Sequence, residues 1–319
     1  FAGASPLNPM ITVGREWVHR VRASMVAATT ILLIRHGARY DYEIGKDAWK
    51  ARCAGSTALT ASDPPLSALG HEQARGLAAH LAKQGDIDAI LVSPYLRALQ
   101  TAQPLAHTAG LPLLVDFACA EAHQRPAALP PLDARLPYFP EIDTSYEPIM
   151  RGVVTGGPDG LEPGVEPRLE HMRRMLHLAR ALPTRPSAGR ASGRTVAIFT
   201  HAASVALVAA LAGPSSLAAA GKLAPCGVCK LLLDEDGTVT VAARGDDISA
   251  YARSSAETAA WGFADSTQPL EAAEQMWAEA LRLGPTDLSA LRVDARPAQD
   301  ASSGGGGVDD SYEPESLVR

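Results

Sequence analysis

The apolar run from Thr30 to Ile34, followed directly by Arg35-His36-Gly37, constrains the fold more than any other stretch of the chain. Consecutive β-branched and apolar residues predict a short buried strand, and Gly37 predicts a sharp stop. The basic residues then lie at the C-terminal end of that strand. In an open α/β sheet this is the end where ligands bind, so the stretch marks a candidate binding edge.

Beyond this stretch, segments with the pattern of strands alternate with segments that have a helical apolar stripe. Strands are predicted over 87–92, 111–117 and 195–200, helices over 68–84, 94–108, 165–182 and 202–212, and a hairpin over 228–233 and 238–243. This alternation predicts an α/β fold, a three-layer sandwich with a mainly parallel central sheet. Ser67 is the expected N-cap of the first helix.

The chain is expected to contain one folded domain with flanking segments. The segments are an irregular N-terminal arm (1–27), the main domain (28–245), a C-terminal extension (246–294) with a helix over 269–283, and a disordered tail (295–319). Two insertions interrupt the main domain: a long polar loop over 40–61 and a segment rich in proline and glycine over 118–164. Long irregular segments in a compact domain often shape a site.

Charge and cysteine content narrow the environment and the partners. A net charge of −6 gives no general attraction to nucleic acid or to an anionic membrane, so an anion site must be built locally. Four cysteines are too few for a disulfide scaffold. They predict a reducing, cytoplasmic environment, with organelle targeting by residues 1–27 as the alternative. Cys226 and Cys229 have CxxC spacing, which we interpret as two buried thiols rather than a zinc or redox site.

Basic side chains and imidazoles recur at the ends of the predicted strands. Arg35 and His36 end the first strand, with Arg39 close behind, Arg97 follows the second and His201 follows the fourth. If they converge, the guanidinium groups and the second imidazole would surround a tetrahedral dianion such as a phosphoryl group. Neighbouring cations would lower the pKa of His36 and leave it free to attack phosphorus, forming a phosphohistidine. The arginines would replace magnesium, so we predict neither a metal nor a cofactor.

Hydrolysis also needs a group that protonates the leaving oxygen and later activates water, and one carboxyl can do both. Glu121, a few residues beyond the third strand, is the candidate, and Asp116 and Glu141 are nearby competitors. Taken alone, His201 would be an ordinary core histidine and Arg97 a charge on a helix surface. Their joint occurrence with His36 at three strand ends favours a site.

Four motifs, in this order, resemble those of the histidine phosphatase superfamily, also called the phosphoglycerate-mutase-like family. They are Arg35-His36-Gly37, residues 63–70 (Asp-Pro-Pro-Leu-Ser-Ala-Leu-Gly), residues 93–102 (Ser-Pro-Tyr-Leu-Arg-Ala-Leu-Gln-Thr-Ala) and residues 200–204 (Thr-His-Ala-Ala-Ser). The resemblance implies a phosphoglycerate-mutase-like fold with His36 as the phosphorylated nucleophile. It also implies that Arg35, Arg97 and His201 hold the phosphate and that a carboxylate after the third strand is the proton donor.

Within branch 1 of this superfamily, the chain looks most like the group that contains the ubiquitin-associated, SH3-containing tyrosine phosphatases and the insect ecdysteroid-phosphate phosphatase. In that group Arg39 would be a further phosphate ligand. The group typically has an acidic residue five positions before the catalytic glutamate, and Asp116 and Glu121 match this spacing. Ala202 stands where the acid phosphatase and phytase branch has an aspartate, which argues against that branch.

We therefore predict a metal-independent phosphomonoesterase that acts through phospho-His36 on a phosphorylated protein or a small phosphorylated metabolite. No nucleic acid or membrane partner is expected, and the sequence leaves a homodimer open. Two alternatives remain: a phosphoglycerate-mutase-type phosphotransferase, and an inactive phosphatase-fold scaffold for protein interaction. Intact Arg35, Arg97 and the two histidines argue against the scaffold, which has no need of a phosphate site.

Overall fold

The structure is a computed structural model of the 319-residue chain. It describes residues 29–54, 56, 59–122, 129, 131–155, 165–182, 193–212, 217, 222–234, 238–254 and 270–288. The predictions for the N-terminal arm, for the tail over 295–319 and for most of the linker at 183–193 lie outside the described residues.

A six-stranded sheet forms the centre of the described fold, in the order β3-β2-β4-β1-β5-β6. The strands are β1 (Thr29–Arg35), β2 (Ala89–Val92), β3 (Leu113–Val115), β4 (Arg194–Thr200), β5 (Val228–Leu233) and β6 (Val239–Arg244). The first four pair in parallel, and β5 and β6 form an antiparallel hairpin beside β1. The predicted mainly parallel sheet and the hairpin are therefore confirmed.

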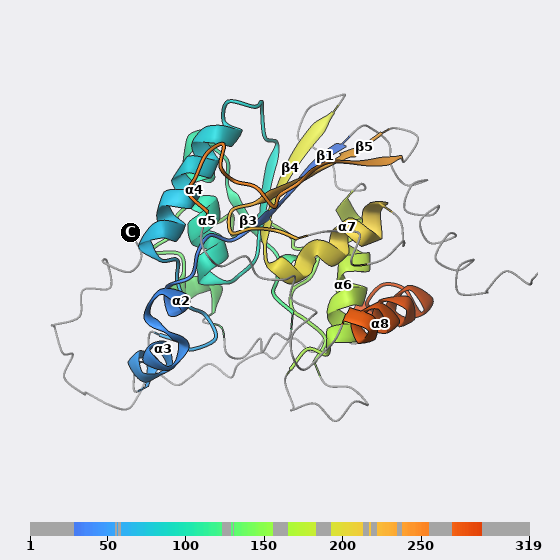
Figure 1. Cartoon of the computed structure of the whole chain (residues 1–319), viewed down its shortest axis with the longest axis horizontal. Coiled ribbons are helices and arrows are strands. Elements are labelled where there is room, and N and C mark those ends of the chain that lie inside the picture. The colour runs from blue at the N-terminus through green and yellow to red at the C-terminus, as the bar shows by residue number, and fades with distance from the viewer. Residues whose placement is uncertain are drawn as a thin grey trace, which may run out of the picture.

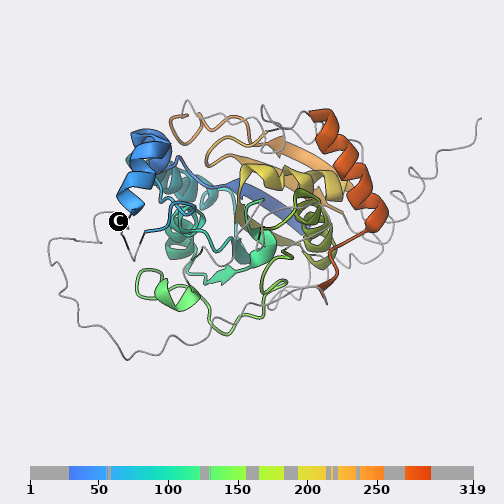
Figure 2. The same cartoon turned by 90° about the horizontal axis from the view of Figure 1, so that it is seen from below.

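One face of the sheet packs against two consecutive helices, α4 (Ala68–Leu81) and α5 (Leu96–Ala109), which lie together in Figures 1 and 2. Side chains alternate between the faces of a strand, so Leu32 and Ile34 of β1 point into this layer. Ser67 caps α4 as predicted, because its side chain accepts a hydrogen bond from the Gly70 amide at 3.1 Å.

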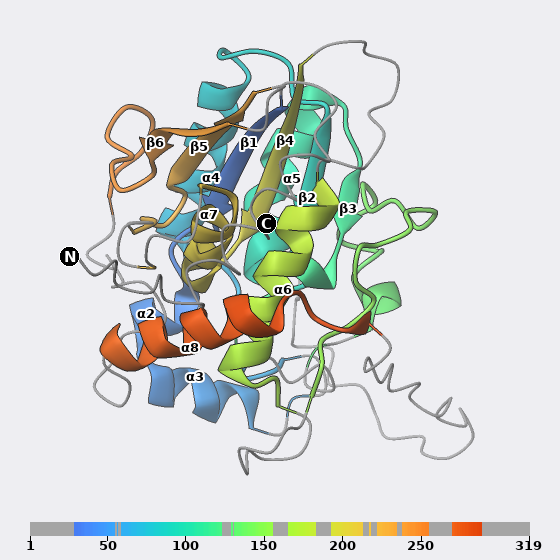
Figure 3. The ribbon, with the colours of Figure 1, turned by 90° about the vertical axis from the view of Figure 1, so that its right-hand side faces the viewer.

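The opposite face packs against α6 (Arg168–Ala181) and α7 (Val205–Ala212), and α8 (Leu270–Leu283) lies across α6 (Figure 3). Ile31 and Leu33 of β1 face this second core. The helix predicted over 269–283 is confirmed, and buried residues of α8 belong to the same core. Helices on both faces of the sheet confirm the three-layer α/β sandwich.

The predicted polar loop over 40–61 is wrong over residues 40–53. These residues contain two short helices, α2 (Tyr40–Ile44) and α3 (Lys46–Cys53), which lie beyond the end of β1 (Figure 3). Trp49 explains the order, since its side chain is buried and its Nε1 donates to the Ala61 carbonyl at 3.0 Å. Among the residues of α3, Trp49 is the buried one, and helices this short show little periodicity.

Other boundaries differ by a few residues from the predictions. The α5 helix begins at Leu96, so Pro94 precedes the helix instead of lying in its first turn. The α4 helix ends at Leu81 and the segment predicted as one helix over 202–212 begins with a single 3₁₀ turn, η5 (Ala202–Ser204). Within the described residues, no helix combines the length and the apolar character that crossing a bilayer requires.

Candidate active site

The register of three adjacent strands brings the predicted site residues to one edge of the sheet. Arg35 of β1 pairs with Thr200 of β4, and the His36 amide donates to the Thr200 carbonyl at 3.0 Å. On the other side of β4, the Ser93 amide after β2 donates to the β4 backbone at 3.0 Å. His36, His201 and Ser93 therefore follow neighbouring strands at the same level, as expected for a parallel sheet.

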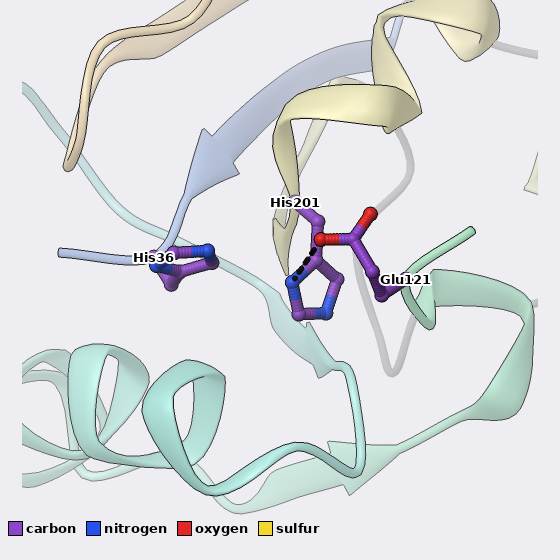
Figure 4. Close-up of side chains that lie close together, drawn as sticks. All are labelled: His36, Glu121 and His201. Atoms are coloured by element: carbon purple, nitrogen blue, oxygen red, sulfur yellow. Dashed lines mark ion pairs between the residues drawn. The ribbon is translucent and has the colours of Figure 1, made fainter. Parts of the chain in front are cut away.

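His36 is held as a neutral imidazole with a lone pair on Nε2. Its Nδ1 donates to the Gly37 carbonyl at 2.8 Å, and because a carbonyl only accepts, the ring proton must lie on Nδ1. Burial is the largest cause that holds the His36 pKa well below its usual value, followed by the charges of Arg97, Arg35 and Arg39. The sequence reasoning assigned this effect to the cations alone. Figure 4 shows the ring at the end of β1.

His201 faces His36 with ring centroids 5.2 Å apart. Arg97 Nη2 donates to His201 Nδ1 at 3.2 Å, so the ring proton lies on Nε2 and is donated to Ser93 Oγ at 2.8 Å. Burial, and then the Arg97 charge, hold the His201 pKa well below its usual value. Both imidazoles are therefore neutral near pH 7, and each donates its single ring proton to a fixed acceptor: His36 to the Gly37 carbonyl and His201 to Ser93 Oγ.

Arg97 supplies buried positive charge beside the two histidines. Its side chain is 2% exposed, and its guanidinium lies 4.3 Å above the Tyr95 ring. Among the described residues, Nε and Nη1 of Arg97 have no hydrogen-bond acceptor; Asp63 Oδ1, at 3.8 Å from Nη1, is too far. Buried donors without partners are costly, and an oxyanion bound beside the guanidinium would accept from one of them.

Glu121 extends from the loop after β3 toward the same group (Figure 4). Its Oε2 lies 3.4 Å from His201 Nδ1 and 3.6 Å from Arg97 Nη2. The side chain is 26% exposed, so it borders both the buried cations and solvent. A carboxyl in that place can exchange protons with a leaving group or with water.

The competing carboxylates are committed elsewhere. Asp116 is fully buried and accepts from three backbone amides and the Tyr146 hydroxyl, although burial raises its pKa. Glu141 pairs with His107 and Gln103. Of the three acids considered in the sequence, Glu121 is the one that the described structure places beside both Arg97 and His201, at 3.6 and 3.4 Å.

The remaining predicted arginines have other partners as well. Arg35 is buried, its Nη1 donates to the Leu223 carbonyl at 3.0 Å, and its charge contributes to the low pKa of His36. Nε and Nη2 of Arg39 pair with the two carboxylate oxygens of Asp41 at 2.9 and 2.6 Å. Arg39 is close enough to lower the pKa of both histidines, but its role as a phosphate ligand stays a prediction.

His36, His201 and Glu121 each offer a ligand atom within 4.8 Å of the others, which is compact enough for a metal ion. However, the Arg97 guanidinium lies 3.2 Å from His201 Nδ1 and would repel a dication there. The donor set therefore suits a dianion better. Cys226 and Cys229 are buried free thiols, as predicted, and burial raises the pKa of Cys229 to about 11, which disfavours the thiolate that zinc needs.

Sequence reasoning missed the residues that hold the first motif in place. Thr101 Oγ1 accepts from the Gly37 amide at 3.0 Å, and Gln73 Oε1 accepts from the Ala38 amide at 2.9 Å. The hydroxyl of Ser93 was quoted only as part of a motif, yet it is the acceptor for His201. The signal for Ser93 was its place directly after a strand; Thr101 stands one helical turn after Arg97.

Comparison with solved structures finds phosphatases among the similar chains, at low similarity. A structure titled mycobacterial hydrolase 1 is 22% identical, with 68% of this chain and 98% of that chain covered and a TM-score of 0.43. An ecdysone phosphate phosphatase from Bombix mori is 17% identical, with 64% of this chain and 88% of that chain covered and a TM-score of 0.46. A mycobacterial glucosyl-3-phosphoglycerate phosphatase is 23% identical, with 68% of this chain and 99% of that chain covered and a TM-score of 0.44. No curated protein matches the chain.

The family assignment therefore rests on the match to a family model. The model described as histidine phosphatase superfamily (branch 1) matches residues 31–245, a span that contains all six candidate site residues. The match covers more than half of the chain and includes the strand ends from which the two histidines extend. This chain belongs to branch 1 of the histidine phosphatase superfamily.

Proposed function

We propose that the chain hydrolyses phosphomonoesters of a protein or a small metabolite through a phosphohistidine at His36, without a metal ion. The observation that best supports this is the lone pair on His36 Nε2: the Nδ1 bond to Gly37 leaves it free, and the ring is buried close enough to Arg97 for that charge to lower the His36 pKa. Membership of the superfamily supports phosphatase or mutase-type activity. A neutral nucleophile beside unpaired guanidinium donors fits attack on a phosphoryl dianion.

In the first step, His36 Nε2 attacks phosphorus while the bond from phosphorus to the ester oxygen breaks. The protonated carboxyl of Glu121 gives its proton to the leaving oxygen, so the alcohol departs neutral. Arg97 and Arg35 offset the charge on the phosphoryl oxygens. His201 can donate its Nε2 proton to a phosphoryl oxygen only if the hydrogen bond from Nε2 to Ser93 Oγ breaks. The products of this step are the alcohol, phospho-His36 and the Glu121 carboxylate.

In the second step, the Glu121 carboxylate takes a proton from water as the water oxygen attacks phosphorus. The bond from phosphorus to Nε2 breaks and its electron pair returns to His36. Inorganic phosphate leaves, and Glu121 is again protonated for the next cycle. One carboxyl therefore acts as the acid and then as the base, and the His36 tautomer is the same at the start and the end.

Hydrolysis of p-nitrophenyl phosphate in EDTA tests this proposal, with His36→Ala as the key variant and His107→Ala as the matched control. His107 is an exposed histidine that pairs with Glu141 away from the site. We expect turnover in the wild type and the control, and a loss of at least about 10³-fold in His36→Ala. Turnover that survives in His36→Ala, or that EDTA abolishes, would contradict the mechanism.

Absence of turnover in the wild type would contradict the hydrolase proposal and favour one of the two alternatives. A mutase would then transfer phosphoryl groups between positions of a phosphorylated substrate after priming by a bisphosphate. A scaffold would show neither reaction. Both outcomes are read from the same purified chain.

A further inference from the structure

Arg174, in the middle of α6, is a buried charge that the reaction itself does not use. Its side chain is 0% exposed and lies among apolar residues such as Met172, Met175 and Leu178. Nε and Nη2 pair with the two carboxylate oxygens of Glu166, both at 2.7 Å. Burying such a pair costs desolvation energy, and this cost is offset only if the remaining guanidinium donors also make hydrogen bonds.

Nη2 of Arg174 also lies 2.7 Å from His171 Nδ1, and its other contacts go to the backbone that leads to Glu121. Nη1 donates to the carbonyls of Phe117, Ala118 and Ala120 at 3.0 to 3.1 Å, and Nη2 donates to the Glu121 carbonyl at 3.0 Å. One rigid guanidinium therefore holds four carbonyls of the turn after β3, which includes η1 (Phe117–Cys119). Bonds from a charged donor in a dry interior are the stronger kind.

The Glu121 side chain depends on this backbone for its place. The β3 strand ends at Val115, so no sheet ladder fixes Glu121, unlike the residues after β1 and β4. The carboxylate has distances of 3.4 and 3.6 Å to His201 and Arg97, longer than hydrogen bonds to charged donors usually are. A shift of about 1 Å in a reacting group can cost on the order of 10²-fold in rate.

We infer that Arg174 is a positioning residue: it holds the backbone of Glu121 so that the carboxyl reaches the leaving oxygen and the attacking water. The inference rests on the proposed role of Glu121 as acid and base. It names a function for a residue on the far side of the turn, which touches neither the phosphoryl group nor the ester oxygen in the proposed reaction.

Arg173 is a matched control on the same helix. It also pairs with a carboxylate, Glu170, at 2.6 Å, and it also donates to backbone carbonyls, those of Gly284 and Pro285. Those carbonyls lie after α8 rather than in the turn that leads to the site. Loss of either arginine removes similar bonds, but only Arg174 should affect Glu121.

The test compares kcat/KM for esters of alcohols and phenols that differ in leaving-group pKa. For Arg174→Met we expect a loss of tenfold or more with alkyl phosphates and a much smaller loss with p-nitrophenyl phosphate, because a poor leaving group needs the proton most. Arg173→Met should show no dependence on the leaving group. In a Glu121→Gln background, Arg174→Met should add no further dependence, because both changes remove the same proton transfer.

Equal losses for all esters in Arg174→Met would overturn the inference. So would a double variant in which Arg174→Met still adds its full leaving-group dependence to that of Glu121→Gln. If Arg174→Met fails to fold by circular dichroism, Arg174→Lys takes its place, since an ammonium keeps the charge but cannot reach all these acceptors. Failure of the proposed function is visible separately. In that case Glu121→Gln itself would slow all esters equally.

Discussion

The two halves of the candidate site are built differently. His36 and His201 follow paired strands, are buried, and are fixed by hydrogen bonds to Gly37, Ser93 and Arg97. Glu121 lies on a turn after the short β3, is 26% exposed, and its backbone is held by Arg174 from a helix. The basic half is thus set by the sheet, whereas the acidic half depends on packing between a turn and α6. Phosphate binding and proton transfer should therefore respond to different mutations.

The largest effect should come from breaking the basic half. Arg97→Met should lower kcat/KM by about 10² to 10³-fold for every phosphate ester, because the charge on the transferring oxygens loses a preorganised donor. The same variant should weaken inhibition by inorganic phosphate. Arg52→Met, which removes an exposed arginine, serves as the control. If Arg97→Met lowered kcat/KM for alkyl phosphates alone, Arg97 would act in proton transfer as Glu121 does, and the two halves would not be separate.

The acidic half should break in a different way. Glu121→Gln should lower kcat/KM by about 10²-fold for alkyl phosphates, while p-nitrophenyl phosphate loses less, since its leaving group needs little protonation. Inhibition by inorganic phosphate should stay as strong as in the wild type, because the arginines and histidines of the basic half are unchanged. Glu141→Gln should leave both measurements unchanged. Weaker phosphate inhibition in Glu121→Gln would place this carboxyl in the binding half.

The burial of the two histidines predicts how stability depends on pH. Their pKa values in the folded chain are well below 6.5, so below pH 6.5 the unfolded chain binds protons that the folded chain does not. The free energy of unfolding is therefore highest above pH 6.5 and falls as the pH decreases, by up to about 1.4 kcal/mol per pH unit for each histidine. Urea unfolding between pH 7 and 5 measures this slope, and His36→Gln should reduce it. An equal slope in the variant would argue against a buried neutral His36.

The smallest effect should come from the support of His201. Ser93→Ala removes the acceptor for the Nε2 proton and should cost about 1 to 3 kcal/mol of unfolding free energy, with a loss of kcat/KM of about tenfold for all esters alike. Because Ser93 belongs to the basic half, a loss limited to alkyl phosphates would be inconsistent with this assignment. Thermal unfolding and the same ester series provide the measurements.

The sequence was sufficient to predict the basic half, and the reason is physical. Long apolar strands such as β1 and β4 end in an abrupt change to polar residues, and parallel pairing then brings His36 and His201 together. The acid could be placed only among three candidates, because a short strand and an irregular turn leave no periodic pattern. The commitment of Asp116 to three amides became visible only in the structure.

Two further features depend on tertiary contacts that local patterns do not show. The helices over residues 40–53 form around Trp49, whose burial depends on chain outside those helices. Arg174 stands four residues before Leu178 on the apolar face of α6, and that position was a signal in the sequence. Its four carbonyl partners, however, come from a turn more than fifty residues earlier in the chain.

The phosphohistidine itself is the most direct test of the account. Glu121→Gln should accumulate it with p-nitrophenyl phosphate, because the first step needs little acid while the second lacks its base. The reaction is quenched in alkaline denaturant, and the digested chain is analysed by mass spectrometry for one added phosphoryl group. We predict that group on His36, and none in a variant that also carries His36→Ala. A phosphoryl group on another residue, or steady turnover by Glu121→Gln with His36 never modified, would contradict the mechanism.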